Sequence, residues 1–258
     1  MISRSRRKHS TPLALLLACV LGLGVPATPA MAMTENEALV VARFLALLLD
    51  SGRVVLASHQ TTINDSSKGQ KGFTPQLFEQ QVVEEFQRRS GGIDLRHLDA
   101  SPVSPQGQAL LKGLLEAGTE VIQERQAIIN ERFLGYKNVI PATWGTWTSE
   151  KFSMRNQMLL KQTALDFRNP NNAPDAFEAD MLAKFASPTY PREDEHIVSE
   201  VTDGGTKLRL LLPLFHKREC LACHGAPKGA TDIAGYLKEG HVEGEPAGAI
   251  SVALPVAP

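Results

Sequence analysis

Three residues near the carboxyl end of the chain have the types and the spacing to do chemistry together. Cys220 and Cys223 are separated by two residues, and His224 follows the second cysteine directly. One helical turn holds two such thiols at the separation of the two vinyl groups of a haem, to which they add as thioethers. The next residue can then give an imidazole nitrogen to the iron. The pattern predicts one covalently attached haem c, with His224 as an axial ligand.

A Cys-x-x-Cys pair has three other uses. A redox-active pair favours a thioredoxin-like βαβ setting, whereas this pair follows a predicted β-hairpin. A zinc site needs a second pair of ligands, and the chain's third cysteine, Cys19, lies in a predicted leader. A structural disulfide suits an oxidising compartment but gives His224 no role. We therefore favour haem.

The second axial ligand is sought among the histidines and methionines, which are the common partners of haem iron. His59, on a long predicted helix, is our first candidate. Met154 and Met158 are alternatives, although methionines at helical spacing usually belong to a core. An open or water-occupied position is the remaining possibility. We expect three further histidines to be surface residues: His196, His216 and His241.

Other side chains are candidates for binding the periphery of the haem. Four basic residues could pair with its propionates, or could be ordinary solvated charges: Arg168, Lys217, Arg218 and Lys228. Three apolar or aromatic residues are expected to pack near the macrocycle: Phe215, Leu221 and Tyr236.

The rest of the chain predicts helices first and an antiparallel sheet later, which is an α+β fold. Apolar spacing and capping residues predict helices over 36–62, 75–89, 105–129, 142–154 and 174–185. Strands are expected over 159–167, 197–201, 207–214 and 247–254. Asp203-Gly204-Gly205 predicts the turn of a hairpin.

The first segment is typical of a leader for export. Four basic residues precede the apolar stretch 12–25, and Ala30-Met31-Ala32 provides a small-residue cleavage site. We expect a signal peptide over 1–32, a haem domain over 33–258 and a periplasmic or secreted protein. The alternatives are a membrane anchor, for which the stretch falls short of about 20 residues, and a lipoprotein modified at Cys19. No later run is apolar enough to span a membrane.

The charge balance restricts the kinds of partner. Lys and Arg number 27 and Asp and Glu number 28, so nothing favours a nucleic-acid partner. The long, amphipathic first helix would suit a homodimer. A redox partner protein or a small gas ligand is the expected partner.

Several ordered segments resemble the PAS-like c-type haem family, which includes sensor domains of bacterial kinases and chemoreceptors and free-standing secreted cytochromes. The segments are Asn64-Asp65, Lys68-Gly69, Gly135-Tyr136-Lys137, Ile140-Pro141, Arg168-Asn169-Pro170, Pro174-Asp175, 220–225, Pro227-Lys228-Gly229, Asp232-Ile233, Gly235-Tyr236 and 248–252. The resemblance implies a PAS-like antiparallel sheet with flanking helices around a haem c. It also implies a variable sixth ligand, a cysteine in one branch, for which this chain has no spare cysteine after the leader.

Two functions follow from these observations. Electron transfer is our first hypothesis, because we expect one haem, export, no output domain and no catalytic residues. Redox or diatomic-gas sensing through a partner is the alternative. An enzyme such as a peroxidase is a weaker third, since nothing in the sequence pairs with His59 as an acid or base.

Overall fold

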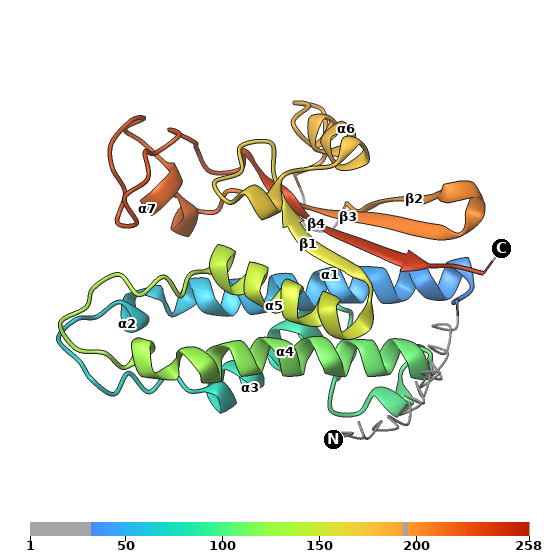
Figure 1. Cartoon of the computed structure of the whole chain (residues 1–258), viewed down its shortest axis with the longest axis horizontal. Helices are drawn as coiled ribbons and strands as arrows, with labels where there is room; N and C mark the ends of the chain where they lie inside the picture. Colours follow the sequence, from blue (N-terminus) through green and yellow to red (C-terminus); the bar gives the residue numbers. More distant parts are fainter. Residues whose placement is uncertain (1–31, 193–195, 258) are drawn as a thin grey trace, which may run out of the picture. The chain divides into compact units, whose positions relative to one another are not determined.

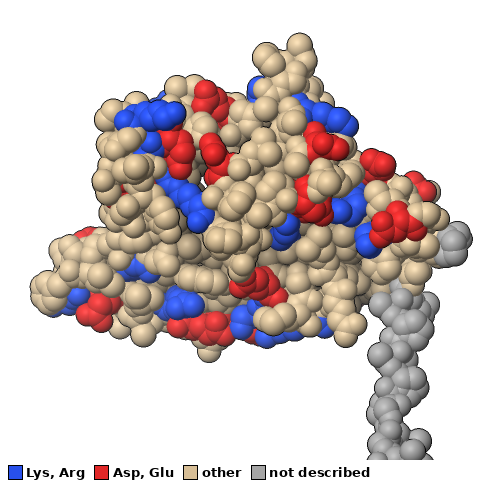
Figure 2. All heavy atoms as spheres, turned by 45° about the horizontal axis from the view of Figure 1, so that its top comes forward, with Lys and Arg blue, Asp and Glu red and all other residues tan. Residues whose placement is uncertain are grey.

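The computed structural model describes residues 32–192 and 196–257. The predicted leader lies outside the described residues, except for Ala32. Among the helices in the described part of the chain, none combines the length and the apolarity needed to cross a bilayer. On the face seen in Figure 2, acidic and basic side chains are interspersed.

The predicted helices are confirmed, those over 75–89 and 105–129 with the predicted ends and the others with shifted ends. The α-helices of the described residues are α1 (Glu35–Ser58), α2 (Gln60–Ile63), α3 (Pro75–Arg89), α4 (Pro105–Ile129), α5 (Pro141–Asn156), α6 (Ala176–Phe185) and α7 (Leu221–His224). The predicted caps form, since the hydroxyls of Thr74 and Ser104 accept backbone N–H groups at the starts of α3 and α4. The single helix expected over 36–62 is divided at His59. The backbone there leaves helical geometry (φ −99°, ψ 2°), and its ring is held by contacts toward α3.

Four antiparallel strands form one sheet in the order β1-β4-β3-β2. They are β1 (Leu159–Thr163), β2 (Val198–Thr202), β3 (Lys207–Phe215) and β4 (Pro246–Pro255). The predicted hairpin turn is confirmed, because Asp203, Gly204 and Gly205 all have positive φ between β2 and β3. Strand β1 is shorter than expected. Its pairing with β4 stops at Thr163, opposite Ala249, and the chain then turns away.

The sheet separates two hydrophobic cores (Figure 1). Helices α1, α3, α4 and α5 lie on one side and α6 lies on the other. Strand β3 shows the alternation that this arrangement requires: Leu208, Leu210 and Leu212 belong to the helix-side core, while Leu211 packs with α6. The fold is therefore α+β, with an antiparallel sheet and flanking helices, consistent with a PAS-like fold.

Candidate functional site

The cysteine motif lies at the end of the central hairpin strand. A short 3₁₀ turn (Arg218–Cys220) follows β3 and leads directly into α7. Cys220 and Cys223 are three residues apart on this helical turn and therefore share a face. Both are half-buried and free of disulfides. Gly225 is needed behind them, because a Cβ there would lie 2.6 Å from the carbonyl oxygen of Leu221.

The chain after α7, residues 225–245, folds back onto the motif and is called the return segment below. The carbonyl oxygen of His224 accepts hydrogen bonds from the backbone N–H groups of Gly240 (3.0 Å) and His241 (2.8 Å). This return brings Glu239, fifteen residues further along the sequence, to the side of the histidine ring.

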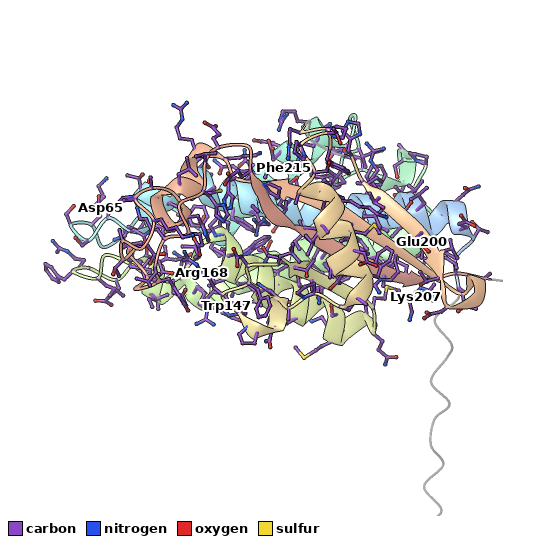
Figure 3. The ribbon with its side chains drawn as sticks, turned by 90° about the horizontal axis from the view of Figure 1, so that it is seen from above. Asp65, Trp147, Arg168, Glu200, Lys207 and Phe215 are labelled. Carbon is purple, nitrogen blue, oxygen red and sulfur yellow. The ribbon has the colours of Figure 1, made fainter. Side chains whose placement is uncertain are left out.

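Arg168 joins the motif to the return segment. From the loop after β1 (Figure 3), its Nε and Nη2 donate to the two carboxylate oxygens of Glu239, at 2.8 and 2.9 Å. Its Nη1 donates to the buried carboxylate of Asp232 at 2.7 Å, and Nη2 also reaches the carbonyl oxygen of Cys223 at 3.2 Å. Four segments are thereby held in one charge-assisted network.

The same network fixes the tautomer of His224. Burial by itself raises the pKa of Glu239, but hydrogen bonds from Arg168 and the neighbouring His224 outweigh it and lower that pKa to about 2. Burial and the nearby Arg168 lower the pKa of His224. An ionised carboxylate can only accept a hydrogen bond, so Nδ1 of His224 carries the proton and donates it to Glu239 across 2.9 Å. Nε2 is left with its lone pair.

Two further histidines lie near His224. The expectation of a surface position is wrong for His216, whereas the side chain of His241 is 25% exposed. His216 is only 6% exposed, because its backbone N–H and C=O pair with Glu245 and Gly244 of the return segment, which covers it. Its ring centroid lies 5.2 Å from that of His224 and 4.4 Å from that of His241. Burial and these two neighbours lower the pKa of His216 to about 4. Its Nδ1 is buried and has no hydrogen-bond partner among the described residues.

The family of this protein follows from a match over nearly the whole chain. Residues 31–255 match the family model described as Tll0287-like. The chain belongs to the Tll0287-like family. Among solved structures, one similar chain is a cyanobacterial haem protein, Tll0287, with 21% sequence identity and a TM-score of 0.36. The match covers 43% of this chain and 69% of that chain. No curated protein matches the sequence.

In this Tll0287-like protein, the residues predicted to bind the periphery of the haem lie in different surroundings. The guanidinium of Arg168 is bound by Glu239 and Asp232, and its pairing with a propionate stays a prediction. Three other basic residues are exposed: Lys217, Arg218 and Lys228. Arg218 lies 3.9 Å from Glu243 in a solvated pair. The two predicted aromatic residues each carry an arginine over the ring, at 5.1 Å for Phe215 and 5.0 Å for Tyr236.

The candidates for the second axial ligand lie in other surroundings. His59 hydrogen-bonds through Nε2 to Gln81 Oε1 at 2.7 Å and packs against Phe73; neither partner belongs to the motif segment. Met158 is part of the helix-side core, and Met154 is 77% exposed. His196 is exposed, as expected. None of these contacts supports a role at the iron.

The structure adds site residues that the sequence reasoning missed. Asp232 and Tyr136 stood in segments of the family resemblance but were given no role. Burial raises the pKa of Tyr136, and the nearby Cys223 and Asp232 add to this effect. The loop between α4 and α5, which carries Tyr136, therefore lies near the motif. Glu239 and His216 had no local signal, because only the folding back of the chain after α7 gives them neighbours.

The donor set of this Tll0287-like protein fits a haem. Two free thiols share a face, the Nε2 lone pair of His224 is available, and the Nδ1 of His216 lacks a partner beside it. The two loops joined by Arg168 also expose large apolar side chains, which suit the faces of a macrocycle. They are Leu165, Phe167, Ile233, Tyr236, Leu237 and Val242. In the described part of the chain, no three His, Cys, Asp or Glu side chains are grouped to hold a bare metal ion.

Proposed function

We propose that this Tll0287-like protein is an exported, single-haem c-type cytochrome that transfers electrons. Cys220 and Cys223 would form the thioether bonds, and His224 would bind the iron through Nε2. The observation that carries the proposal is the hydrogen bond from His224 Nδ1 to Glu239, which presents Nε2 as a free donor beside two unpaired thiols. The haem would supply a one-electron iron couple.

Family membership supports the haem. A cyanobacterial protein that gives the family its description is a haem protein, and the motif is of the kind that attaches haem covalently. Export over residues 1–32 is part of the proposal, since c-type attachment takes place outside the cytoplasm. A single motif in the sequence implies a single haem.

The surroundings of the motif support electron transfer. Cys220, Cys223 and His224 are all partly exposed, so a group held by them lies within reach of a docked redox protein. The network from Arg168 to Glu239 and Asp232 holds the ligand and its loop in one geometry. A ligand held in this way reorganises little when the iron changes its charge. The partner would be a redox protein.

One observation favours a second candidate, the sensing of redox state or of a diatomic gas through a partner. The first choice for the sixth ligand, His59, is engaged by Gln81 and Phe73. If nothing replaces it, the distal side of the iron is open to a gas.

The visible spectrum of the purified protein separates these functions. We expect a c-type spectrum that persists after denaturation and acid–acetone extraction, with low-spin bands that carbon monoxide leaves unchanged in the ferrous state. A high-spin spectrum, or a ready shift with carbon monoxide, would contradict electron transfer and favour gas binding. A protein without haem bands would overturn both functions.

A further inference from the structure

Two neighbouring histidines of this protein each hold a carboxylate on Nδ1. Glu239 Oε2 lies 2.9 Å from His224, and Glu245 Oε2 lies 2.8 Å from His241. The rings of both histidines lie beside the ring of His216. Only His224 belongs to the cysteine motif. Glu239 therefore contacts the proposed ligand of the iron, and Glu245 contacts a histidine outside the motif.

Glu239 is held far more firmly than Glu245. Both of its oxygens accept hydrogen bonds from the Arg168 guanidinium. Arg168 is anchored in turn by Asp232, whose Oδ1 accepts the backbone N–H groups of Ala234 (2.8 Å) and Tyr236 (2.9 Å). The Asp232 side chain is fully buried. Glu245 is 45% exposed in its side chain, and its described hydrogen bonds come from His241 and the neighbouring backbone.

We propose that Glu239 is a positioning residue that sets the donor strength of His224 and thereby lowers the reduction potential of the iron. The proposal rests on the proposed function, because it requires a haem on His224. A ligating histidine whose other N–H is held by a carboxylate is fixed in orientation and becomes a more basic ligand. A stronger donor favours ferric over ferrous iron.

Arg168 sets the strength of this effect. By taking up both Glu239 oxygens it orients the carboxylate toward Nδ1 and draws off part of its negative charge. Arg168 also donates a hydrogen bond to the carbonyl oxygen of Cys223. The same side chain therefore fixes both the motif and the Glu239 carboxylate that accepts from Nδ1.

The test compares Glu239→Gln with Glu245→Gln in the full-length, haem-loaded protein. Both variants remove one carboxylate beside a histidine of the same cluster, so the general loss of negative charge is matched. We expect Glu239→Gln to make the midpoint potential more positive by roughly 59 mV, a tenfold change in a one-electron equilibrium. Glu245→Gln should shift it much less. The g values of the low-spin ferric haem in electron paramagnetic resonance, which report the donor strength of the axial histidine, should change in Glu239→Gln alone.

Equal potential shifts in the two variants would overturn the inference, since only general electrostatics would be acting. An unchanged potential and unchanged ferric g values in Glu239→Gln would overturn it as well. Should Glu239→Gln fail to accumulate with haem, Glu239→Asp takes its place. It keeps the charge but draws the acceptor back from Nδ1, so a positive shift supports the inference and no shift refutes it. Wild-type protein without haem would refute the proposed function instead.

Discussion

Replacing both Cys220 and Cys223 with alanine should leave a folded protein that carries no covalent haem. Cys220, at the end of the 3₁₀ turn, and Cys223, in α7, lie on one face of the helical turn and are in no disulfide. After expression with a c-type maturation system, the wild-type chain should retain the haem stain on a denaturing gel, and the double variant should lose it completely. Each single variant should keep one bond at most.

His224→Ala extends this test to the iron. We expect it to abolish the normal low-spin spectrum, because the Nε2 donor is removed. The matched control is His241→Ala, which removes a neighbouring histidine that also bonds a carboxylate through Nδ1 but should keep the attached haem and the axial ligand. An unchanged spectrum in His224→Ala would show that the ligand assignment is wrong. Haem retained by the double cysteine variant on the gel would show that its attachment does not depend on the motif.

Gly52→Ala should destabilise the protein by about 2 kcal/mol, although alanine favours a helix. Gly52 lies in α1, and an added Cβ would overlap the ring of Trp144 from α5, with Cζ3 at 2.7 Å and Cζ2 at 2.9 Å. The ring cannot move aside easily. On its other side a Cβ at Gly118 of α4 would lie 2.7 Å from Cζ2, and the indole Nε1–H donates to the Gly118 carbonyl oxygen.

Gly113→Ala is the control for this prediction, since it adds the same methyl group to α4 with nothing within 4 Å. It should stabilise the protein by roughly 0.5–1 kcal/mol through helix propensity alone. Thermal unfolding checks both variants: a loss of roughly 4–8 °C is expected for Gly52→Ala and a small gain for Gly113→Ala. Equal midpoints in the two variants would show that α1, α4 and α5 do not close around Trp144 as described.

The packing around Trp144 bears on the site as well as on stability. The helix layer that it holds together supports the face of the sheet formed by β3 and β4. The motif and the return segment lie between the end of β3 and the start of β4.

Much of the fold could be predicted from the sequence, because its signals are local. Thr74-Pro75 and Ser104-Pro105 begin helices since a hydroxyl caps the first turn and proline fits its first position. Asp203-Gly204-Gly205 forms the hairpin turn since its backbone needs positive φ. The Cys-x-x-Cys-His pattern is local in the same sense: one helical turn places its thiols on one face.

The tertiary structure alone decided which residues surround His224. Arg168 was expected to pair with a haem propionate, and His216 and His241 were expected at the surface. Glu239 was not considered. The two acids that bond Arg168 are 64 and 71 residues away along the chain, and Glu239 is fifteen residues from His224. A long side chain such as arginine can satisfy its charge with any acid that folding brings near. Its partner is set by how the loop after β1 packs against the return segment at the end of the sheet. The spacing of residues along the sequence does not predict this packing.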